Sequence, residues 1–520
     1  SQIFTFRQIL SSSASFVKDK NMRNGEKNEE NINSLRELNG MSSKDLHAVI
    51  EDHALEEVPE SERKGWLSLS WNTAGIVTTL IQLFFGALVT FAAGIKIGIM
   101  AGIFVTVIGG LLGWAVGHIA YKSGLSSTVM SRYYGFGNKG SLIASAIYGF
   151  MILGFLALEN ALLYKGFLFY FGIADTLAAK VIIYGILTVL WVLLTTFGFQ
   201  LVARVSSLTL VLFLAVLLYM VGDVILSSGQ SWASVLSFGA QFPPEVLAAM
   251  GADTDMGKFV FAINVLIGSA GALALVDADF GRYAKRSVDI GIAAFLGNIA
   301  MDIVMLTVGG IVMFAGMKQV TEYYITVKGM DAVAAAQTAL QSPDSIAAAF
   351  IIFGGLLGTI LMVLAQGKAQ VLNTYSGSLA LSNFFAVFNW RPGRFIFVVL
   401  GNIIGLIMLY GKILELVNAW ITILGVITTC FAGIMIADYF IARSKTGRQD
   451  TRQFGADEIN WAGVVSTIVG VILAHYVLNN LIPIEFFTSL IVSGVVYPLL
   501  RLYVFKPNCA DNLDTVKTSI

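Results

Sequence analysis

Charged residues are scarce in this chain, and their scarcity argues against a soluble protein. Asp, Glu, Lys and Arg make up 13% of the 520 residues, about half the fraction that is usual in soluble proteins. Positive and negative charges cancel to a formal net charge of zero, so the balance gives no sign of a nucleic-acid partner. The two cysteines, Cys430 in an apolar run and Cys509 in the polar tail, exclude a disulfide framework.

The motifs of several enzyme classes are missing as well. No stretch has the G-x-x-x-x-G-K-[ST] spacing of a phosphate-binding loop, although GFGNKGS at 135–141 has a similar composition. The four histidines, at positions 47, 53, 118 and 475, are scattered, so we expect no metal site. We also expect no catalytic residues and no cofactor. A membrane-embedded enzyme and a sensor remain the alternatives from other classes.

Long apolar runs are abundant. The chain is 56% hydrophobic with a mean hydropathy of +0.76, and runs of about 20 residues can cross the hydrocarbon core as helices. We therefore predict an all-α polytopic membrane protein with twelve transmembrane helices. Their expected limits are 66–93, 97–121, 142–171, 177–198, 202–227, 258–281, 288–316, 345–383, 394–411, 414–442, 460–479 and 483–505.

Polar segments and basic residues predict the domains and the orientation. Residues 1–62 read as a largely disordered cytosolic N-terminal extension, 63–443 as a ten-helix transport core, 444–506 as the last two transmembrane helices, and 507–520 as a cytosolic tail. Lys and Arg concentrate in one alternating set of connections, which predicts that both termini are cytoplasmic. The protein is thus expected to be a multi-pass protein of the plasma (inner) membrane. The basic residues of this set include Arg63, Lys122, Arg132, Lys139, Arg282, Lys285, Arg286, Arg391 and Arg443.

Two glycine clusters indicate broken helices. The first run contains NTAGIVTTLIQ at 72–82, and the sixth contains VLIGSAGALALVDADFGRY at 265–283. If the chain divides into spans one to five and six to ten, the clusters occupy equivalent positions in the two halves. Paired interruptions of this kind are typical of transporters built from inverted repeats, with freed backbone groups facing a binding cavity.

Several stretches are similar to one known family. They are ERKGWLSLSWNTAG at 62–75, YKSGLSSTVMSRYYGFGNKGS at 121–141, DADFGRY at 277–283, LNTYSGSLALSN at 372–383, IMIADYFIAR at 434–443 and INWAG at 459–463. In this order and spacing they resemble the nucleobase:cation symporter-1 family, and within it the cytosine permease branch. The resemblance implies a five-plus-five inverted repeat like that of the leucine transporter, with helices 1 and 6 broken. It also implies a secondary transporter that imports cytosine, a purine or a related heterocycle as a monomeric unit.

The resemblance also implies a substrate site. Gly154 and Phe155 match the position that supplies a stacking face, and Ser269 matches a polar position of the sixth span. Ala270 stands where the family often has a second aromatic residue, which predicts a pocket that is wider on one side. Such a pocket would suit a bicyclic or substituted ring such as a purine, or would bind cytosine more weakly. Asn373 matches a residue that reads the polar edge of the ring. Further candidates from their polarity inside apolar runs are Gln82, Glu159, Asn160 and Gln366.

Lys368 stands where sodium-coupled members of the fold have hydroxyl ligands. The resembling stretch aligns Lys368 and Ala369 with two hydroxyl residues that bind sodium together with backbone carbonyls near Gly75. An ammonium donates hydrogen bonds and cannot coordinate a cation. We therefore expect Lys368 to replace the ion and transport to be proton-coupled, with Glu159 or Asp302 as counter-charge.

Other arrangements stay open. Lys368 could instead reach a cytoplasmic cavity. The protein could also be a sodium-coupled or facilitative carrier of allantoin, hydantoin, uracil or a vitamin-like heterocycle. Asp279 and Arg282, at the cytoplasmic end of the sixth span, are expected to form a structural ion pair.

Overall fold

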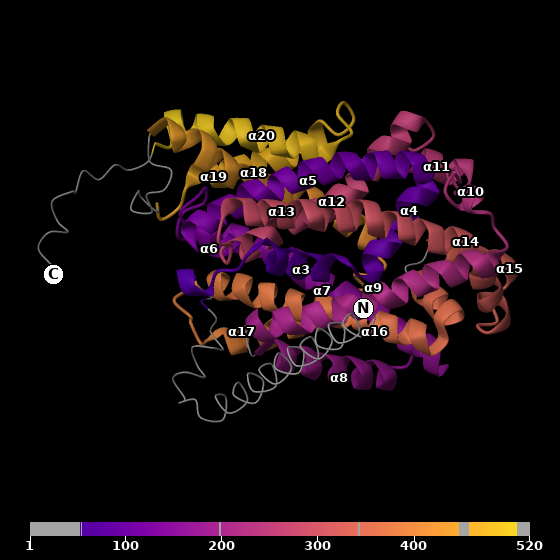
Figure 1. The fold of residues 1–520 in the computed structure, drawn as a ribbon. Helices are drawn as coiled ribbons and strands as arrows, with labels where there is room; N and C mark the ends of the chain where they lie inside the picture. Colours follow the sequence, from indigo (N-terminus) through magenta and orange to yellow (C-terminus); the bar gives the residue numbers. More distant parts are fainter. Residues whose placement is uncertain (1–52, 54, 197–198, 342–343, 447–456, 507–520) are drawn as a thin grey trace, which may run out of the picture. The chain divides into compact units, whose positions relative to one another are not determined.

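The computed structural model describes residues 53, 55–196, 199–341, 344–446 and 457–506 (Figure 1). Residues 1–52, most of the extension that we predicted to be disordered, lie outside the described residues. The same holds for the predicted tail 507–520, which contains Cys509. The chain divides into two units, Ser1–Asp52 and His53–Ile520, and the second holds all the described elements.

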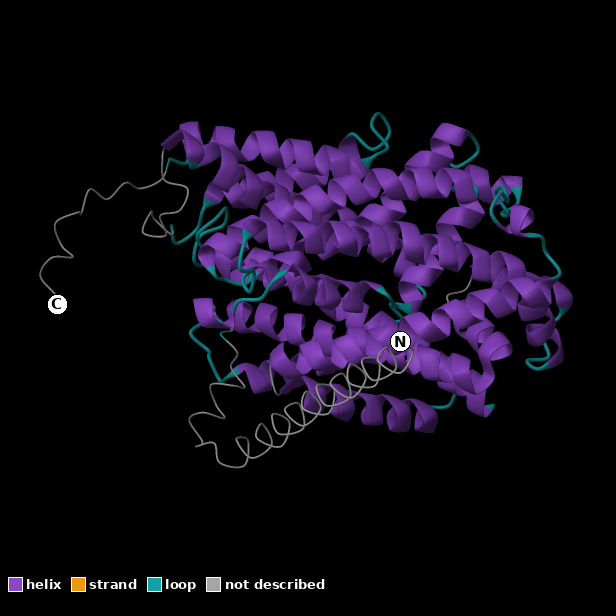
Figure 2. Ribbon diagram, viewed as in Figure 1, coloured by secondary structure: helices purple, strands orange, loops and turns teal. Residues whose placement is uncertain are grey.

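The described residues form helices and connecting loops without a β-strand (Figure 2). This confirms the predicted all-α class. The long helices coincide with the predicted apolar runs to within a few residues, except that the seventh run continues as helix for ten residues beyond its predicted end at 316. Their bounds are α3 Trp66–Val77, α4 Leu80–Ala93, α5 Ile95–Ser123, α7 Ser141–Phe171, α8 Leu177–Thr196, α9 Phe199–Ser228, α12 Asp255–Gly281, α13 Ser287–Asn298, α14 Leu306–Thr326, α16 Asp344–Ala386, α17 Arg394–Tyr410, α18 Val417–Ala437, α19 Trp461–Ile472 and α20 Glu485–Leu499.

Short elements connect or extend the long helices. Several long helices end or continue in π-helical turns. The short elements are η1 Glu60–Glu62, α6 Ser127–Met130, α10 Trp232–Val235, α11 Pro244–Ala249, η2 Ile299–Met305, α15 Ala332–Gln341, η3 Asp438–Ala442, η4 Ser444–Thr446, η5 Leu473–Val477 and η6 Leu500–Val504.

Within the described residues, nine helices are long and apolar enough to cross a membrane, and the bent pair α3–α4 makes ten. Two shorter apolar helices, α17 and α19 with its extension η5, coincide with the ninth and eleventh predicted spans. All twelve predicted runs are therefore helical, while twelve crossings remain a prediction.

The first span is broken, as its glycine and threonine content predicted. α3 ends at Val77 and α4 begins at Leu80, and the two helices are bent by 67°. Thr78 and Thr79 between them have non-helical backbone angles. Backbone carbonyls at the end of α3 and amides at the start of α4 therefore have no partners within their own helices.

The predicted break in the sixth span is wrong, because α12 is one continuous helix from Asp255 to Gly281. Its glycines serve close packing against α18 instead. A Cβ at Gly268 would lie 2.5 Å from the Ile421 carbonyl oxygen, and one at Gly271 would lie 2.6 Å from Oγ1 of Thr428. A second interruption occurs in α16, where Gly355 has φ 49° and ψ −119°.

Two groups of helices surround the broken span. α12 packs along α5 and α18, and α13 packs on α5 and α3, whereas α16 packs along α7 and α9. α3 contacts α9, α12, α13 and α16, so it lies between the two groups (Figure 1). Helix α8 is largely exposed and apolar on its outer side, which suits contact with lipid.

Residues assigned to the N-terminal extension contact the helical unit near the start of α3. The amide of Val58 donates to the carbonyl oxygen of Gly124 (3.0 Å), and Nη1 of Arg282 donates to the carbonyl oxygen of His53 (2.8 Å). The backbone of Lys64 pairs with that of Ala284. The end of α12 thus holds the chain segment that leads into the broken span.

Candidate functional site

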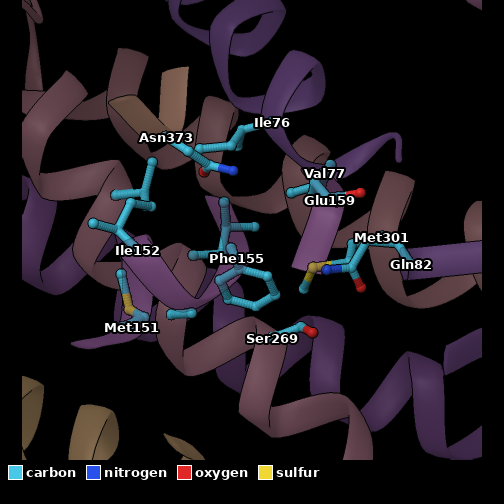
Figure 3. Close-up of a pocket in the computed structure, with 13 residues that line it drawn as sticks. Ile76, Val77, Gln82, Met151, Ile152, Phe155, Glu159, Ser269, Met301 and Asn373 are labelled. Carbon is cyan, nitrogen blue, oxygen red and sulfur yellow. The ribbon is translucent and has the colours of Figure 1, made fainter. Parts of the chain in front are cut away.

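A pocket lies beside the break in the first span. Its lining comes from α3, α4, α7, α12, η2 and α16, so it collects residues that are far apart in the sequence (Figure 3). Among the described residues the lining consists of Ile76, Val77, Gln82, Met151, Ile152, Phe155, Glu159, Ser269, Ala272, Leu273, Val276, Met301 and Asn373. Five predicted substrate residues are in this set: Gln82, Phe155, Glu159, Ser269 and Asn373.

The Phe155 ring lies near the centre of this lining (Figure 3). The indole of Trp420 from α18 packs edge-on against it, with ring centroids 4.9 Å apart and an interplanar angle of 84°. Gly154 is not among the lining residues. A Cβ at Gly154 would lie 2.4 Å from Cζ2 of Trp420, so the glycine makes room for the indole behind Phe155. Trp420 carried no signal in the sequence.

Polar side chains surround the aromatic ring from four elements. Gln82 comes from α4, Glu159 from α7, Ser269 from α12 and Asn373 from α16 (Figure 3). Among the described residues the Ser269 hydroxyl has no hydrogen-bond partner, and Nδ2 of Asn373 donates to Oε1 of Gln370 (3.3 Å). The pocket therefore combines an apolar face with a polar edge, which is the usual composition of a small-molecule site.

Ala270 does not line the pocket. The face of α12 that does so repeats at helical spacing through Ser269, Ala272, Leu273 and Val276. The Ala270 methyl group points toward α5, where it would lie 3.0 Å from a Cβ at Gly109. The structure therefore corrects the expectation that Ala270 widens the pocket, because one residue along a helix turns a side chain to another face.

Glu159 is held at the start of α4. Nε2 of Gln366 donates to the Glu159 carboxylate and also to its backbone carbonyl oxygen (3.1 Å). Oε1 of Gln366 accepts from the amide of Leu80 (3.5 Å). The Thr79 hydroxyl and the Ile81 amide also face the carboxylate. A negative charge there complements the positive end of the α4 dipole.

Lys368 is held at the end of α3. Its fully buried ammonium donates to the carbonyl oxygens of Gly75 (3.0 Å) and Thr78, and it lies 4.5 Å from the centroid of the Phe213 ring. The complete burial of this side chain argues against the alternative in which Lys368 reaches a cytoplasmic cavity. Glu159 is close enough to attract it. A positive charge here complements the negative end of the α3 dipole.

The other predicted polar residues are placed elsewhere. Asp302 lies fully buried in η2, and neither carboxylate oxygen has a hydrogen-bond partner among the described residues. Asp302 is therefore not the counter-charge of Lys368, whereas Glu159 is close enough to act as one. Asn160 accepts from Nε1 of Trp191 (2.9 Å), away from the pocket lining.

The predicted cytoplasmic pair is tied to several neighbours. Asp279 accepts from the amide and hydroxyl of Ser127 (both 2.8 Å) and from the Tyr148 hydroxyl (2.6 Å), and it also interacts electrostatically with Arg282. Arg282 donates to the Tyr375 hydroxyl (2.7 Å). These contacts fit the structural role expected for both residues.

A central pocket beside a broken span, inside an all-helical apolar protein, is typical of a class of secondary transporters. Solved structures of this class are similar in fold. Mhp1, a nucleobase-cation-symport-1 family transporter with bromovinylhydantoin bound, matches with a TM-score of 0.62 and 17% identity over 85% of this chain and 93% of that one. An inward-facing conformation of Mhp1 matches with a TM-score of 0.63 and 19% identity, over 85% of this chain and 91% of that one. A Na⁺-coupled sialic acid symporter matches with a TM-score of 0.56 and 13% identity, over 89% of this chain and 94% of that one.

Residues 57–496 match the family described as permeases for cytosine/purines, uracil, thiamine and allantoin. The chain belongs to this family, the nucleobase:cation symporter-1 family, and is a multi-pass membrane transporter with the inverted-repeat fold. No curated protein sequence matches the chain.

Proposed function

We propose that this protein imports a nucleobase or a closely related planar heterocycle, in symport with protons. The main observation in support is the pocket beside the break, in which the Phe155 ring is surrounded by Gln82, Glu159, Ser269 and Asn373. The family description, which names cytosine and purines first, supports this substrate class.

An aromatic ring with polar neighbours suits a nucleobase for two physical reasons. The flat π-face of a base stacks on a rigid phenyl ring at little entropic cost. The edge of the base carries fixed donors and acceptors, which unpaired groups such as the Ser269 hydroxyl can satisfy. Amides and a carboxylate together can both donate and accept, so they can distinguish one heterocycle from another.

Lys368 supports independence from sodium. Its ammonium contacts the Gly75 and Thr78 carbonyl oxygens at the end of α3, where a bound cation would otherwise compensate the helix end. An alkali ion beside this buried ammonium would be repelled by a like charge. The driving ion is then a proton, and the buried carboxyl groups are candidates to carry it.

A second candidate function is a sodium-coupled or facilitative carrier of another heterocycle of the family. The bromovinylhydantoin bound to Mhp1 and the range of the family description, which includes uracil, thiamine and allantoin, favour keeping it. We further propose location in the plasma (inner) membrane, cytoplasmic termini and a monomeric functional unit.

Uptake by proteoliposomes tests the proposal. Purified protein is reconstituted, and entry of radiolabelled cytosine, adenine, hypoxanthine, uracil, allantoin and hydantoin is compared in sodium and in choline medium. We expect saturable uptake of a nucleobase in choline, stimulated when the lumen is made alkaline. A strict requirement for sodium would contradict proton coupling, and uptake of none of these compounds would contradict the substrate class.

A further inference from the structure

A second buried polar cluster lies where α12 meets α3 and α5, outside the pocket lining. Its centre is Asp277 in α12, directly after the pocket-lining residue Val276. Oγ1 of Thr73, in α3, donates to Oδ1 of Asp277 (3.2 Å). The carboxyl group is completely buried, and among the described residues its Oδ2 has no hydrogen-bond partner.

The neighbouring helix α5 makes room for this carboxyl group. A Cβ at Gly113 would lie 2.5 Å from Oδ2 of Asp277, and one at Gly109, one turn away, would lie 2.2 Å from Oδ1 of Asn298. The Asn298 Oδ1 is also without a partner among the described residues, while its Nδ2 donates to the Ala294 carbonyl oxygen (2.8 Å). Two unpaired oxygen acceptors therefore face the same stripe of α5. A proton on Oδ2 of Asp277 turns that carboxylate oxygen into a donor.

No charged side chain compensates Asp277 within the described part of the chain. Besides burial, only the Thr73 hydroxyl acts on its carboxyl group. The nearest titratable group on α12 is Asp279, which accepts from Ser127 and Tyr148. On α5 it is His118, whose Nδ1 is hydrogen-bonded to the Ser287 hydroxyl (2.7 Å).

In the described ranges, the other helices packed against α12 also offer Asp277 no charged partner. From α3 and α13 the groups facing this cluster are the uncharged Thr73 and Asn298, and Cys430 of α18 faces α19 instead. An isolated ionised carboxylate in such surroundings is strongly disfavoured.

We propose that Asp277 is a proton-binding site of the transport cycle. The proton adds to Oδ2 and forms a neutral carboxylic acid, and it returns to water when the carboxylate is restored. This inference rests on the proposed function, since it names the group that carries the coupled proton. Glu159 and Lys368 compensate each other at the two half-helix ends, whereas Asp277 has neither a cation nor a second donor among the residues that the structure describes.

The position of Asp277 links the proton to the broken span. Thr73, its hydrogen-bond partner, lies on the same half-helix as Ile76 and Val77, which line the pocket, and as Gly75, which binds Lys368. Asp277 is four residues from the end of α12 at Gly281, about 6 Å along the helix axis. Movement of α3 away from α12 would break the Thr73 hydrogen bond. It would also open a path for the proton from Asp277 to water at the Gly281 end of α12.

The test compares net accumulation with exchange for the wild type, Asp277→Asn and two comparison variants. In sodium-free proteoliposomes with an alkaline lumen, the wild type should accumulate substrate about tenfold per pH unit for one proton per neutral molecule. Asp277→Asn should exchange internal for external substrate at equal pH, which shows an intact pocket, but should not accumulate it. Asp255→Asn removes an exposed charge at the opposite end of the same helix and should accumulate normally. The infrared carbonyl band of a protonated carboxylic acid should weaken in Asp277→Asn.

The outcomes separate the two proposals. A wild type that ignores the pH gradient refutes proton coupling itself. Accumulation by Asp277→Asn, or loss of accumulation by Asp302→Asn in its place, overturns the assignment to Asp277. If Asp277→Asn loses both exchange and accumulation, the assignment is also overturned, because the residue would then be needed for the structure rather than for proton binding.

Discussion

At the scale of single residues, the pocket rests on one aromatic ring and one pair of buried charges. Phe155 presents its ring to the cavity because Trp420 supports it from behind, and Gly154 leaves space for that support. Lys368 and Glu159 stand at opposite ends of the break in the first span. Each helix end therefore meets a charge of the sign that its dipole favours.

The first prediction concerns the ring. Phe155→Ala should weaken apparent substrate affinity about tenfold to a hundredfold, because base–aromatic stacking contributes about 1–3 kcal/mol. The Michaelis constant for uptake measures the effect, with surface expression checked in parallel. Phe171→Ala, at the exposed end of the same helix, is the control. Unchanged affinity in a well-expressed Phe155→Ala protein would show that this ring does not bind the substrate.

The second prediction concerns the charge pair. Lys368→Ala leaves the Glu159 carboxylate and the α3 carbonyl oxygens without their buried cation, which should cost about 3–5 kcal/mol and abolish or uncouple transport. Adding Glu159→Gln should recover part of the thermal stability, since the double variant no longer buries a single uncompensated charge. Thermal unfolding of the purified variants measures both effects. Equal melting temperatures for the wild type and Lys368→Ala would contradict the role of this pair.

At the scale of elements, glycines of α5 and α12 decide which helices come close. α12 is continuous, and Gly268 and Gly271 bring it against α18, while Gly109 and Gly113 of α5 receive side chains from α13 and α12. The described backbone is interrupted at Thr78 and Thr79 of the first span and at Gly355 of α16. The break between α3 and α4 is the one whose half-helix ends lie beside the pocket.

The third prediction follows from this packing. Gly268→Ala places a methyl group 2.5 Å from the Ile421 carbonyl oxygen, so the two helices must separate and the melting temperature should fall. Overpacking of this kind typically costs about 1–3 kcal/mol. Gly185→Ala in α8, where nothing lies within 4 Å of the added carbon, is the matched control and should be neutral or stabilising. A melting temperature for Gly268→Ala equal to that of the control would contradict the packing role.

At the scale of the whole molecule, the basic residues predict which side faces the cytoplasm. Arg286 lies just beyond one end of α12, and Met256 lies at the other end. The 27 residues of this helix span about 40 Å, enough to separate the two sides of a bilayer.

The fourth prediction tests this orientation. In a protein whose two natural cysteines are replaced by serine, Met256→Cys should react with a membrane-impermeant maleimide in intact cells. Arg286→Cys should react only after the membrane is permeabilised. Labelling measured by mass shift reads out both positions. The reverse pattern would place the termini outside the cell.

The sequence by itself determined the helical class, the limits of the apolar helices, the break in the first span and the family. Each of these depends on hydropathy or on motifs that are local in the chain, such as the run around Gly75, Thr78 and Thr79. It also singled out Lys368, because a lysine inside an apolar run is conspicuous. Only the tertiary structure decided which faces of the helices meet: it turned Ala270 toward α5, placed Trp420 behind Phe155 and brought Thr73 to Asp277. These contacts join residues that are distant in sequence, and a shift of one residue in helical register changes the neighbours of every side chain.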